Sequence, residues 1–536
     1  MNVAQYLVEQ LRVWGVQRVY GLVGDAILDF VDALEKAGGP RFVAVRHEAS
    51  AAFMASAEAK LSGRPACCTA TTGPGAVNLL NGLADAALDQ VPVLAITGQS
   101  ARSRIGTDQK QYFDQQRLFS SVVGFSQLVA APEALPAVLP LAWRAMLGEG
   151  KAAHLSVPMD LWRAEVKAPV RQEEPYLGAR HHPAIDVVRG AAHRMGQSAR
   201  PVIVCGHGAR TAREALIALA ERWQAPIVRS LGGIGVVPGH HPLVVGGYGA
   251  AGSAASHRLL QQADMALVVG TTWWPHGHVP LDLPIVQIDV RPGNVGRDAE
   301  VAWGIVGDAA AVLPTLLEAV EPASRPDWLS QAQALRRDWE ARVAPLRRAG
   351  GPPVSPGYLV TELEQAIAPD AVVVLDVGDH VLWFGQFFRG EQHRVLFSGT
   401  WRSMGFGIPA AIAAALCSEG RQVVALVGDG GLAMSAGELS TVAQLGVPVT
   451  VVVADNGWLA MEKNRMDKAG LASEATRLPA VDLVKLAEAS GLRAWRVEAA
   501  GQLPDVLRAA LGCGGPALVD VPVVAGPPPD PRVTGG

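Results

Sequence analysis

The chain has 536 residues, a length that allows about three or four domains. Its 46 Lys and Arg residues against 50 Asp and Glu residues give a formal net charge of −4, which argues against a protein that binds nucleic acid or another polyanion. The 58 glycines and 37 prolines show no repeating period, which excludes collagen-like and low-complexity chains.

The five cysteines lie in apolar or glycine-rich stretches without the spacing of zinc ligands, so we expect reduced thiols in a cytoplasmic protein. The first residues read as an amphipathic helix without a signal-peptide pattern. No apolar run approaches the ~18 residues of a membrane-spanning helix. The sequence therefore predicts no membrane partner.

Short runs rich in β-branched residues recur along the chain, and a glycine-containing turn and a helical stretch rich in Ala and Leu follow each run. This alternation predicts an α/β protein with doubly wound parallel sheets. The near-continuous apolar character of the runs predicts strands that are buried on both faces. We expect strands at 91–97, 201–206, 265–270, 284–290, 371–378, 423–428 and 448–455.

Two polar segments that contain proline, 166–186 and 320–356, interrupt this pattern. We interpret them as linkers, the second of which contains a helix. The final segment, AGPPPDPRVTGG, has too little apolar content to order itself. The expected domains are an N-terminal domain at 1–165, a central Rossmann-like domain at 185–320 and a C-terminal domain at 355–525.

In the first expected domain, Arg46, His47 and Glu48 stand at the start of a helix rich in small residues. The helix dipole favours a glutamate in the first turn. Taken alone, this segment therefore favours a structural role for Glu48 over a catalytic one.

The last expected domain contains a Gly-Asp-Gly-Gly turn at 428–431, directly after a strand and before a helix. Backbone N–H groups of such a turn can approach a phosphate without obstruction by Cβ atoms. Asn456 follows the next strand, so Asp429 and Asn456 are expected at neighbouring strand ends. A carboxylate and an amide oxygen there suit Mg²⁺, which takes its remaining ligands from a diphosphate and water. The glycine-rich turn or the turn at Asn456 would by itself be an ordinary structural turn. The two together, at this spacing, predict a site for Mg²⁺ and a diphosphate.

This Gly-Asp-Gly turn, followed by Asn456, resembles the signature of thiamine diphosphate enzymes, in particular the acetolactate synthase and pyruvate oxidase branch. The resemblance covers about residues 1–525. It implies that Mg²⁺ is bound by Asp429, by the side chain of Asn456 and by the backbone carbonyl of Trp458. Asp455 stands where the family usually has an Asn that is not expected to bind the metal.

The resemblance also gives Glu48 a catalytic role, because the sequence around it resembles the family's Arg-His-Glu segment. In this chemistry the 4′-imino group of the cofactor removes the thiazolium C2 proton, and that tautomer needs a proton donor at the opposite ring nitrogen. A glutamate whose pKa is raised in an apolar pocket can be that donor. Met404 matches the side chain that wedges between the two cofactor rings, although a lone methionine is commonly a packing residue.

Other family segments place further residues at the cofactor. Gln111 matches a glutamine that faces the reaction centre, with Tyr112 where a glutamate is common. Asp379 replaces a usual glutamine beside the diphosphate, and His380 next to it suits a structural role equally well. The residues implied at the cofactor are Gly24, Gly73, Asn78, Gly378, Asp379, His380, Met404, Gly428, Gly430 and Gly431.

The middle domain leaves the question of a flavin open. The glycines of the 206–210 turn are weakly typical of dinucleotide binding. Later segments resemble those around FAD in flavin-containing members, yet members without FAD keep the same fold. The residues implied for FAD are Gly206, Gly208, Gly270, Thr271, Asp289, Gly307 and Asp308.

The resemblance therefore implies a thiamine diphosphate- and Mg²⁺-dependent decarboxylation of a pyruvate-like 2-oxo acid with carboligation, as in acetolactate synthases. FAD-linked oxidation and simple decarboxylation stay open as alternatives, since Arg465 stands where acetolactate synthases typically have a Trp. A silent scaffold is disfavoured by the presence of Glu48, Asp429 and Asn456. The resemblance also implies a homodimer or homotetramer with active sites between chains.

Overall fold

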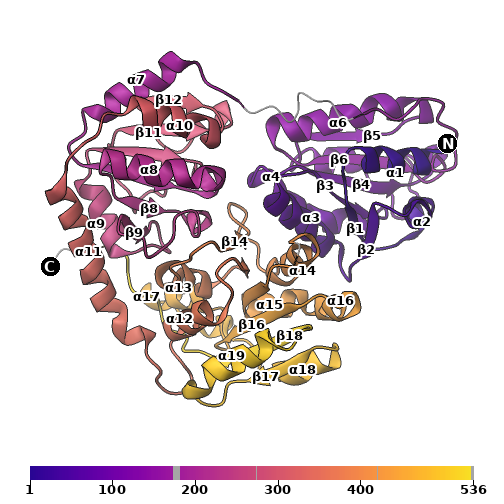
Figure 1. Cartoon of the computed structure of the whole chain (residues 1–536). Helices are drawn as coiled ribbons and strands as arrows, with labels where there is room; N and C mark the ends of the chain where they lie inside the picture. The colour runs from indigo at the N-terminus through magenta and orange to yellow at the C-terminus, as the bar shows by residue number, and fades with distance from the viewer. Residues whose placement is uncertain (173–180, 273, 419, 533–536) are drawn as a thin grey trace.

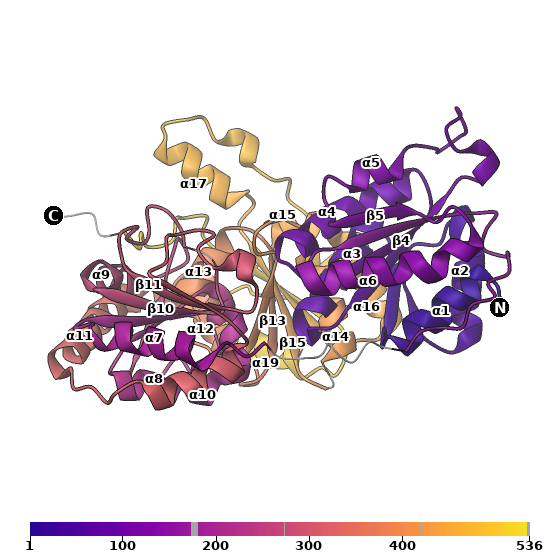
Figure 2. The ribbon, with the colours of Figure 1, turned by 90° about the horizontal axis from the view of Figure 1, so that it is seen from above.

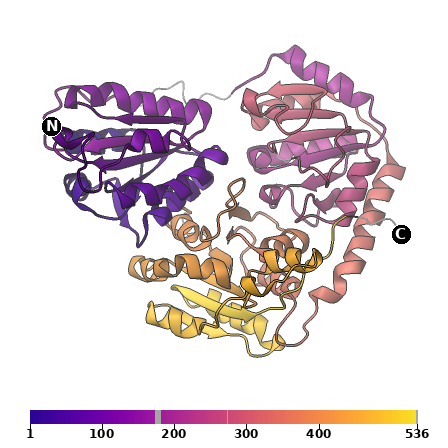
Figure 3. The ribbon, with the colours of Figure 1, turned by 180° about the vertical axis from the view of Figure 1, so that it is seen from behind.

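The computed structural model describes residues 1–172, 181–272, 274–418 and 420–532. Within these ranges the chain forms three six-stranded sheets, all of whose strand pairs are parallel, with helices on their faces. Figure 1 shows the N-terminal domain on the right, the middle domain on the left and the C-terminal domain below, and Figure 3 shows them from behind. The predicted α/β class is confirmed.

The N-terminal sheet has the strand order β2-β1-β3-β4-β6-β5. Its strands are β1 (Arg18–Gly21), β2 (Arg41–Ala44), β3 (Ala66–Ala70), β4 (Val93–Gln99), β5 (Phe125–Leu128) and β6 (Ala153–Pro158). Its helices are α1 (Val3–Val13), α2 (Leu28–Ala37), α3 (Glu48–Ser62), α4 (Pro74–Leu88), α5 (Gln115–Phe119) and α6 (Leu135–Glu149).

The middle sheet has the order β12-β11-β10-β7-β8-β9. Its strands are β7 (Pro201–Cys205), β8 (Ile227–Arg229), β9 (Val244–Gly247), β10 (Met265–Val269), β11 (Ile285–Asp289) and β12 (Trp303–Val306). Its helices are α7 (Ile185–Gly196), α8 (Arg213–Trp223), α9 (Ala254–Gln262) and α10 (Ala309–Ala319), and α11 (Pro326–Val343) runs along the outside toward the C-terminal domain (Figure 1).

The C-terminal sheet has the order β14-β13-β15-β16-β18-β17. Its strands are β13 (Val372–Leu375), β14 (Arg394–Phe397), β15 (Val423–Gly428), β16 (Val449–Asp455), β17 (Arg493–Arg496) and β18 (Ala517–Pro522). Its helices are α12 (Pro356–Ala366), α13 (Asp379–Phe387), α14 (Gly407–Cys417), α15 (Asp429–Ser435), α16 (Leu439–Leu445), α17 (Ala460–Lys468), α18 (Leu483–Ala489) and α19 (Leu503–Leu511). Figure 2 shows α17 projecting from the body of this domain.

The seven strands expected from sequence are all present, with ends shifted by up to three residues. The central strands β15 and β16 are almost completely buried, as their uninterrupted apolar sequence predicts. The three sheets lie at 18–158, 201–306 and 372–522. Strand positions do not define where a domain begins or ends, so the proposed domain limits stay predictions. Residues 173–180 of the first proposed linker lie outside the described residues.

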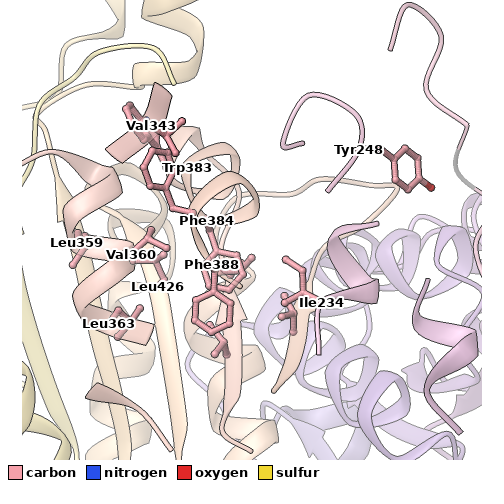
Figure 4. Packing of buried hydrophobic residues seen from close by; sticks show 14 of the residues in the cluster. Ile234, Tyr248, Val343, Leu359, Val360, Leu363, Trp383, Phe384, Phe388 and Leu426 are labelled. Carbon is pink, nitrogen blue, oxygen red and sulfur yellow. The ribbon is translucent and has the colours of Figure 1, made fainter. Parts of the chain in front are cut away.

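Two apolar clusters join the domains into one body. One contains residues of the middle and C-terminal domains, and Figure 4 shows Ile234 of the former beside Phe388 of the latter. Phe388 stacks on Phe384 with 4.3 Å between ring centroids. The other cluster includes the alanine-rich helices α3 and α14, which pack against each other. Because α3 begins with Glu48, this packing fixes the position of Glu48 against the C-terminal domain.

The end of the chain differs from expectation. Within residues 525–532, the Gln386 amide of α13 donates a 2.9 Å hydrogen bond to the Pro529 carbonyl, and Pro531 is buried. Low apolar content prevents a core of its own, but docking on α13 supplies the missing contacts. Residues 533–536 of the predicted unordered segment lie outside the described residues. No helix among the described residues is long and apolar enough to cross a membrane.

Candidate functional site

A cleft opens at the carboxyl ends of β13, β15 and β16 in the C-terminal domain. This is the edge at which open α/β sheets bind ligands. Ten of the residues singled out from the sequence line it, and they are Gly378, Asp379, His380, Met404, Gly428, Asp429, Gly430, Gly431, Asn456 and Trp458.

Asp429 and Asn456 lie on neighbouring strand ends, as their spacing predicts, because β15 pairs with β16 in parallel register. Asp429 is the first residue of α15, and its Oδ2 accepts a 2.9 Å hydrogen bond from the Gly457 N–H. The Asn456 Oδ1 accepts a 3.0 Å hydrogen bond from the Trp458 N–H. Two side-chain oxygens are thereby held at one edge of the cleft.

The electrostatics of this edge suit a cation. Burial first and the nearby Asp455 carboxylate second raise the pKa of Asp429 to about 6, against backbone N–H groups that lower it. A carboxylate, an amide oxygen and a backbone carbonyl form an all-oxygen donor set, which fits Mg²⁺. No group of three or more His, Cys, Asp or Glu side chains that could hold a metal ion occurs among the described residues.

Asp376, directly after β13, contacts two segments that line the cleft and was not singled out from the sequence. Its buried carboxylate accepts hydrogen bonds from the N–H groups of Val377, at 2.6 Å, and Gly405, at 3.0 Å. Burial raises its pKa to about 6, against the lowering effect of these N–H donors. A Cβ at Gly431 would lie 2.6 Å from Asp376 Oδ2, so this position in the turn requires glycine. Asp376 therefore ties the Met404–Gly405 loop to the glycine-rich turn.

Met404 faces the same turn. A Cβ added at Gly430 would lie 3.2 Å from the Met404 Cε and 2.8 Å from a Leu459 methyl group. These two apolar side chains therefore lie over the glycine-rich turn, inside the cleft.

Asp379 and His380 begin α13 and are buried. Asp379 Oδ2 accepts a 2.9 Å hydrogen bond from the Trp383 indole N–H, and burial raises the pKa of Asp379 to about 6. The carboxylate that replaces the usual glutamine is thus held along its own helix. The His380 Nε2 lies 3.0 Å from the Asp376 carbonyl, to which it donates, and burial lowers the pKa of His380 to about 4. His380 is therefore a neutral ring at physiological pH.

A second cluster lies in the N-terminal domain around Glu48, the first residue of α3. The Asn78 side-chain N–H donates a 3.0 Å hydrogen bond to Glu48 Oε2. A Cβ at Gly75 would lie 3.0 Å from Glu48 Oε1, so the glycine leaves room for the carboxylate. Glu48 is 7 % exposed, so its carboxyl group is buried.

Gly24, Gly73 and Gln111 lie on loops at the same edge of the N-terminal sheet. Gly24 packs on Thr71, and a Cβ at Gly73 would lie 2.8 Å from the Cβ of Gln111. The Thr72 hydroxyl donates a 3.3 Å hydrogen bond to the Gln111 carbonyl. Gln111 has φ +63°, a left-handed conformation that non-glycine residues rarely adopt. These contacts fix the Gln111 loop over the segment that contains Gly73.

Glu438 connects the N-terminal domain to the C-terminal domain, and it too was not singled out from the sequence. One of its carboxylate oxygens accepts hydrogen bonds from the N–H groups of Arg46, at 2.9 Å, and His47, at 3.1 Å. The other accepts a 2.7 Å hydrogen bond from the Thr441 hydroxyl. The start of α3, and with it Glu48, is therefore held against the α15–α16 connection of the C-terminal domain.

The residues considered for FAD are engaged in contacts within the middle domain. The glycines at 206 and 208 pack against Gly270, and the Gly208 N–H donates a 3.0 Å hydrogen bond to the Gly270 carbonyl. Asp289 Oδ1 accepts hydrogen bonds from the Arg291 N–H and the Asn294 amide, and Asp308 caps α10. Thr271 follows β10 and Gly307 follows β12, so both lie at the carboxyl edge of the middle sheet. Close packing of two loops therefore accounts for the glycines at 206, 208 and 270.

Comparison with known families places both clusters in domains of one kind. Residues 1–118 match the model of the thiamine pyrophosphate enzyme N-terminal TPP binding domain, 188–316 the central domain, and 376–521 the C-terminal TPP binding domain. YdaP of Bacillus subtilis (strain 168), whose name refers to thiamine pyrophosphate, is 33% identical over 99% of this chain and 93% of its own length. The chain belongs to the thiamine pyrophosphate enzyme family.

Other members of the thiamine pyrophosphate enzyme family have names that state a reaction. The acetolactate synthase large subunit IlvB1 of Mycobacterium tuberculosis (strain CDC 1551 / Oshkosh) is 34% identical over 97% of this chain and 87% of its own length. The acetolactate synthase isozyme 1 large subunit of Escherichia coli (strain K12) is 30% identical over 97% and 94%. The resemblance seen in the sequence is thus confirmed, and this thiamine pyrophosphate enzyme is of the acetolactate synthase-like branch.

Proposed function

We propose that this protein decarboxylates pyruvate or a closely related 2-oxo acid with thiamine diphosphate and Mg²⁺, and joins the resulting fragment to a second carbonyl compound. The proposal rests above all on the oxygens of Asp429 and Asn456, which lie beside a glycine-rich turn in a domain of the TPP-binding family. The names of the acetolactate synthase relatives support the carboligation step. When bound, thiamine diphosphate would supply the carbon nucleophile and the electron sink.

The metal and the diphosphate would be held by the C-terminal domain. Asp429, the Asn456 side chain and the Trp458 carbonyl are the proposed Mg²⁺ ligands. Backbone N–H groups of the 428–431 turn, at the N-terminus of α15, would bind the diphosphate. Met404 would support the bent shape of the cofactor from within the cleft, a role that its place over the glycine-rich turn supports.

Glu48 is the residue proposed to activate the cofactor ring. As a buried carboxyl group fixed at the start of α3, it is proposed to hydrogen-bond the ring nitrogen of the cofactor. Asn78 donates to Oε2, so Oε1 is the oxygen left for the ring, and Gly75 keeps space open beside it. Gln111, fixed beside Gly73, is proposed to face the reacting groups, and the adjacent Tyr112 to influence the choice of substrate.

We also propose that two copies of the chain complete each site. The described residues that line the diphosphate cleft all come from the C-terminal domain, and Glu48 is not among them. A second chain that brings its N-terminal domain over the cleft would unite the two clusters. Light scattering after size-exclusion chromatography should show a dimer or tetramer, and a fully active monomer would contradict this.

The reaction is tested with the purified protein, thiamine diphosphate, Mg²⁺ and a panel of 2-oxo acids. CO₂ release, coupled products and dye reduction should be followed together. We expect CO₂ release with a carboligation product and little dye reduction. Dye reduction with an absorbance band near 450 nm would instead indicate flavin-linked oxidation, and CO₂ release with free aldehyde a simple decarboxylase. Arg465, which pairs with Glu462 on the projecting helix α17, is where this chain departs from the synthases.

Absence of measurable thiamine diphosphate affinity by calorimetry would overturn the whole proposal in favour of a silent scaffold. We further propose that the protein acts in the cytoplasm. This is supported by the five cysteines, all of which are free in the structure.

A further inference from the structure

A second cleft, separate from the cofactor site, lies between the middle and C-terminal domains. It has a volume of about 490 Å³. One wall is formed by the first turns of α8 and α10, and the other by the start of β14 and the segment before β15. Since the diphosphate cleft is at the carboxyl ends of the C-terminal strands, this second cleft lies at the opposite edge of that sheet. We call it the arginine cleft, and its lining includes Arg210, Arg213, Arg394 and Arg421.

The four guanidinium groups are held by backbone carbonyls instead of by carboxylates. Arg210 donates to the carbonyls of residues 393 and 234, and Arg213 donates to that of residue 235. Arg394 donates to the carbonyl of residue 61, at 3.3 Å, and Arg421 to that of residue 370, at 3.4 Å. Across residues 1–172, 181–272, 274–418 and 420–532, no carboxylate lies within 4.0 Å of any of the four groups. The arginines are therefore fixed in place without being neutralised.

Two further observations indicate that the cleft suits an anion. The Arg210 Nε is buried and makes no hydrogen bond within the described part of the chain. The pKa of Arg210 is lowered to about 10, first by burial and then by the charges of Arg394, Arg213 and Arg421. A cluster of like charges that repel one another at a partly buried site is unfavourable unless an anion binds there.

We propose that the arginine cleft binds a phosphorylated small molecule, which links the middle domain to the C-terminal domain. Guanidinium groups match phosphate oxygens in geometry and form paired, charge-assisted hydrogen bonds with them. Among the described residues the lining contains these four arginines and one carboxylate, Glu214, so the local charge is +3, which suits a di- or triphosphate group. The volume exceeds what one phosphate ion fills and is in the range of small-molecule sites.

The arginine cleft is distinct from every site considered so far. Its lining shares no residue with the diphosphate cleft and none with the residues considered for FAD. Its occupant would therefore bind together with thiamine diphosphate instead of competing with it. Because two arginines come from each domain, binding should also stabilise the contact between the domains.

The test is calorimetry on protein saturated with thiamine diphosphate and Mg²⁺, titrated with inorganic phosphate and, separately, with ADP at ionic strength matched by KCl. We expect saturable binding of ADP, and weaker binding of inorganic phosphate because it meets fewer of the arginines. Equal affinity for the two probes would identify a site for a single phosphate group, which also supports the phosphate chemistry. No saturable binding of either probe would overturn the proposal.

Variants locate the binding. In the double variant Arg213→Gln/Arg421→Gln we expect at least a tenfold loss of ADP affinity with thiamine diphosphate affinity unchanged within about twofold. The matched control is Arg12→Gln/Arg163→Gln, which removes the same charge from exposed residues that pair with Glu9 and Asp29. ADP affinity that is unchanged in the first variant, or lost equally in the control, would overturn the proposal.

A further variant tests the site even if the double arginine variant does not fold. Ala310→Glu adds a carboxylate to the cleft at the first turn of α10, where the helix dipole favours negative charge, and removes no hydrogen-bonding side chain. We expect the same loss of ADP affinity. Wild-type affinity in folded Ala310→Glu protein would contradict the site.

Discussion

The Asn78 side-chain amide donates a 3.0 Å hydrogen bond to Oε2 of Glu48, which leaves the other carboxyl oxygen directed at the space beside Gly75. One oxygen of a buried carboxyl group is thereby committed to the protein. The other remains for a ligand. This asymmetry is what a residue needs if it is to present a proton to a cofactor ring in one direction only.

Replacement of Glu48 by Gln should preserve the fold and abolish activation of the cofactor. Glutamine keeps the size and a hydrogen-bond donor but has no proton to transfer, so we expect turnover to fall by ~10²- to 10⁴-fold. Exchange of the cofactor C2 proton, followed by NMR, should slow in parallel, while thiamine diphosphate still binds.

The matched control is Glu58→Gln on the same helix. Glu58 is equally buried but pairs with Arg18 and the Tyr20 hydroxyl, away from Asn78. We expect lower stability and a normal rate of C2 exchange per folded molecule. Glu48→Gln protein with more than a few per cent of wild-type turnover would refute the assignment.

Replacement of Asp429 by Asn should weaken the binding of thiamine diphosphate in the presence of Mg²⁺. Loss of the charged ligand reduces the attraction for a hard cation, and we expect a decrease in apparent affinity of ~10- to 100-fold, measured by calorimetry at several Mg²⁺ concentrations. Asp455→Asn is the control, because Asp455 lies beside Asp429 but is directed toward Arg496, at 3.7 Å. Equal losses in both variants would mean that general charge, and not ligation, is responsible.

Replacement of Met404 by Ala should lower the turnover number more than the affinity for the cofactor. Removal of the side chain from the cleft would let the two cofactor rings leave their reactive arrangement, and misplacement of this kind costs about 10²-fold in rate. Steady-state kinetics and cofactor titration separate the two effects. Met434→Ala, at a side chain that is 66% exposed, should change neither quantity. A loss of affinity without a loss of turnover number would contradict the wedge role.

The stability of the protein should fall as the pH drops below about 6.5, in part because of His154. This ring is fully buried, stacks on Phe119 with 3.7 Å between centroids, and has its pKa lowered from 6.5 to about 3 by burial. Between these two values the unfolded chain binds a proton that the folded chain does not, so stability increases with pH in this window. One such group contributes ~1.4 kcal/mol per pH unit.

His154→Gln should therefore show a shallower pH dependence of its urea denaturation midpoint between pH 5 and 6.5 than the wild type. Some dependence should remain, because burial also lowers the pKa of His207 and His380 to about 4. The exposed His240 supplies the control variant His240→Gln, which should keep the wild-type slope. An unchanged slope in His154→Gln would show that this ring does not titrate as proposed.

The sequence was informative wherever the signal is local. A strand, a glycine-rich turn and a helix follow one another directly around Asp429, and parallel pairing of β15 with β16 then places Asn456 beside it. Asp376 and Glu438 could not be found in this way, because their partners are loops that are distant in sequence. A single acidic residue at the end of a strand or between two helices carries no local pattern.

The glycines of the middle domain show the opposite difficulty. The pattern at 206–208 is typical of a turn that approaches a dinucleotide, but the structure shows that Gly208 approaches the backbone of Gly270. The spacing of glycines indicates that another group comes close to the backbone, but it does not tell whether that group is a ligand or another segment of the protein. The binding of FAD accordingly stays a prediction, and the absorption spectrum of the purified protein is its test.

The bond between Glu438 and the start of α3 has a consequence for tolerance to substitution. Its two donors are main-chain amides, so the identity of the side chains at positions 46 and 47 is irrelevant to this bond, and proline alone would remove a donor. The acceptor has no such freedom, since only a residue of glutamate's reach and charge can serve both amides at once. Variation at position 47 should therefore leave this bond intact, whereas a change at residue 438 should remove it; at position 46 the side chain adds a separate contact, because it donates a 3.2 Å hydrogen bond to the Ser440 hydroxyl.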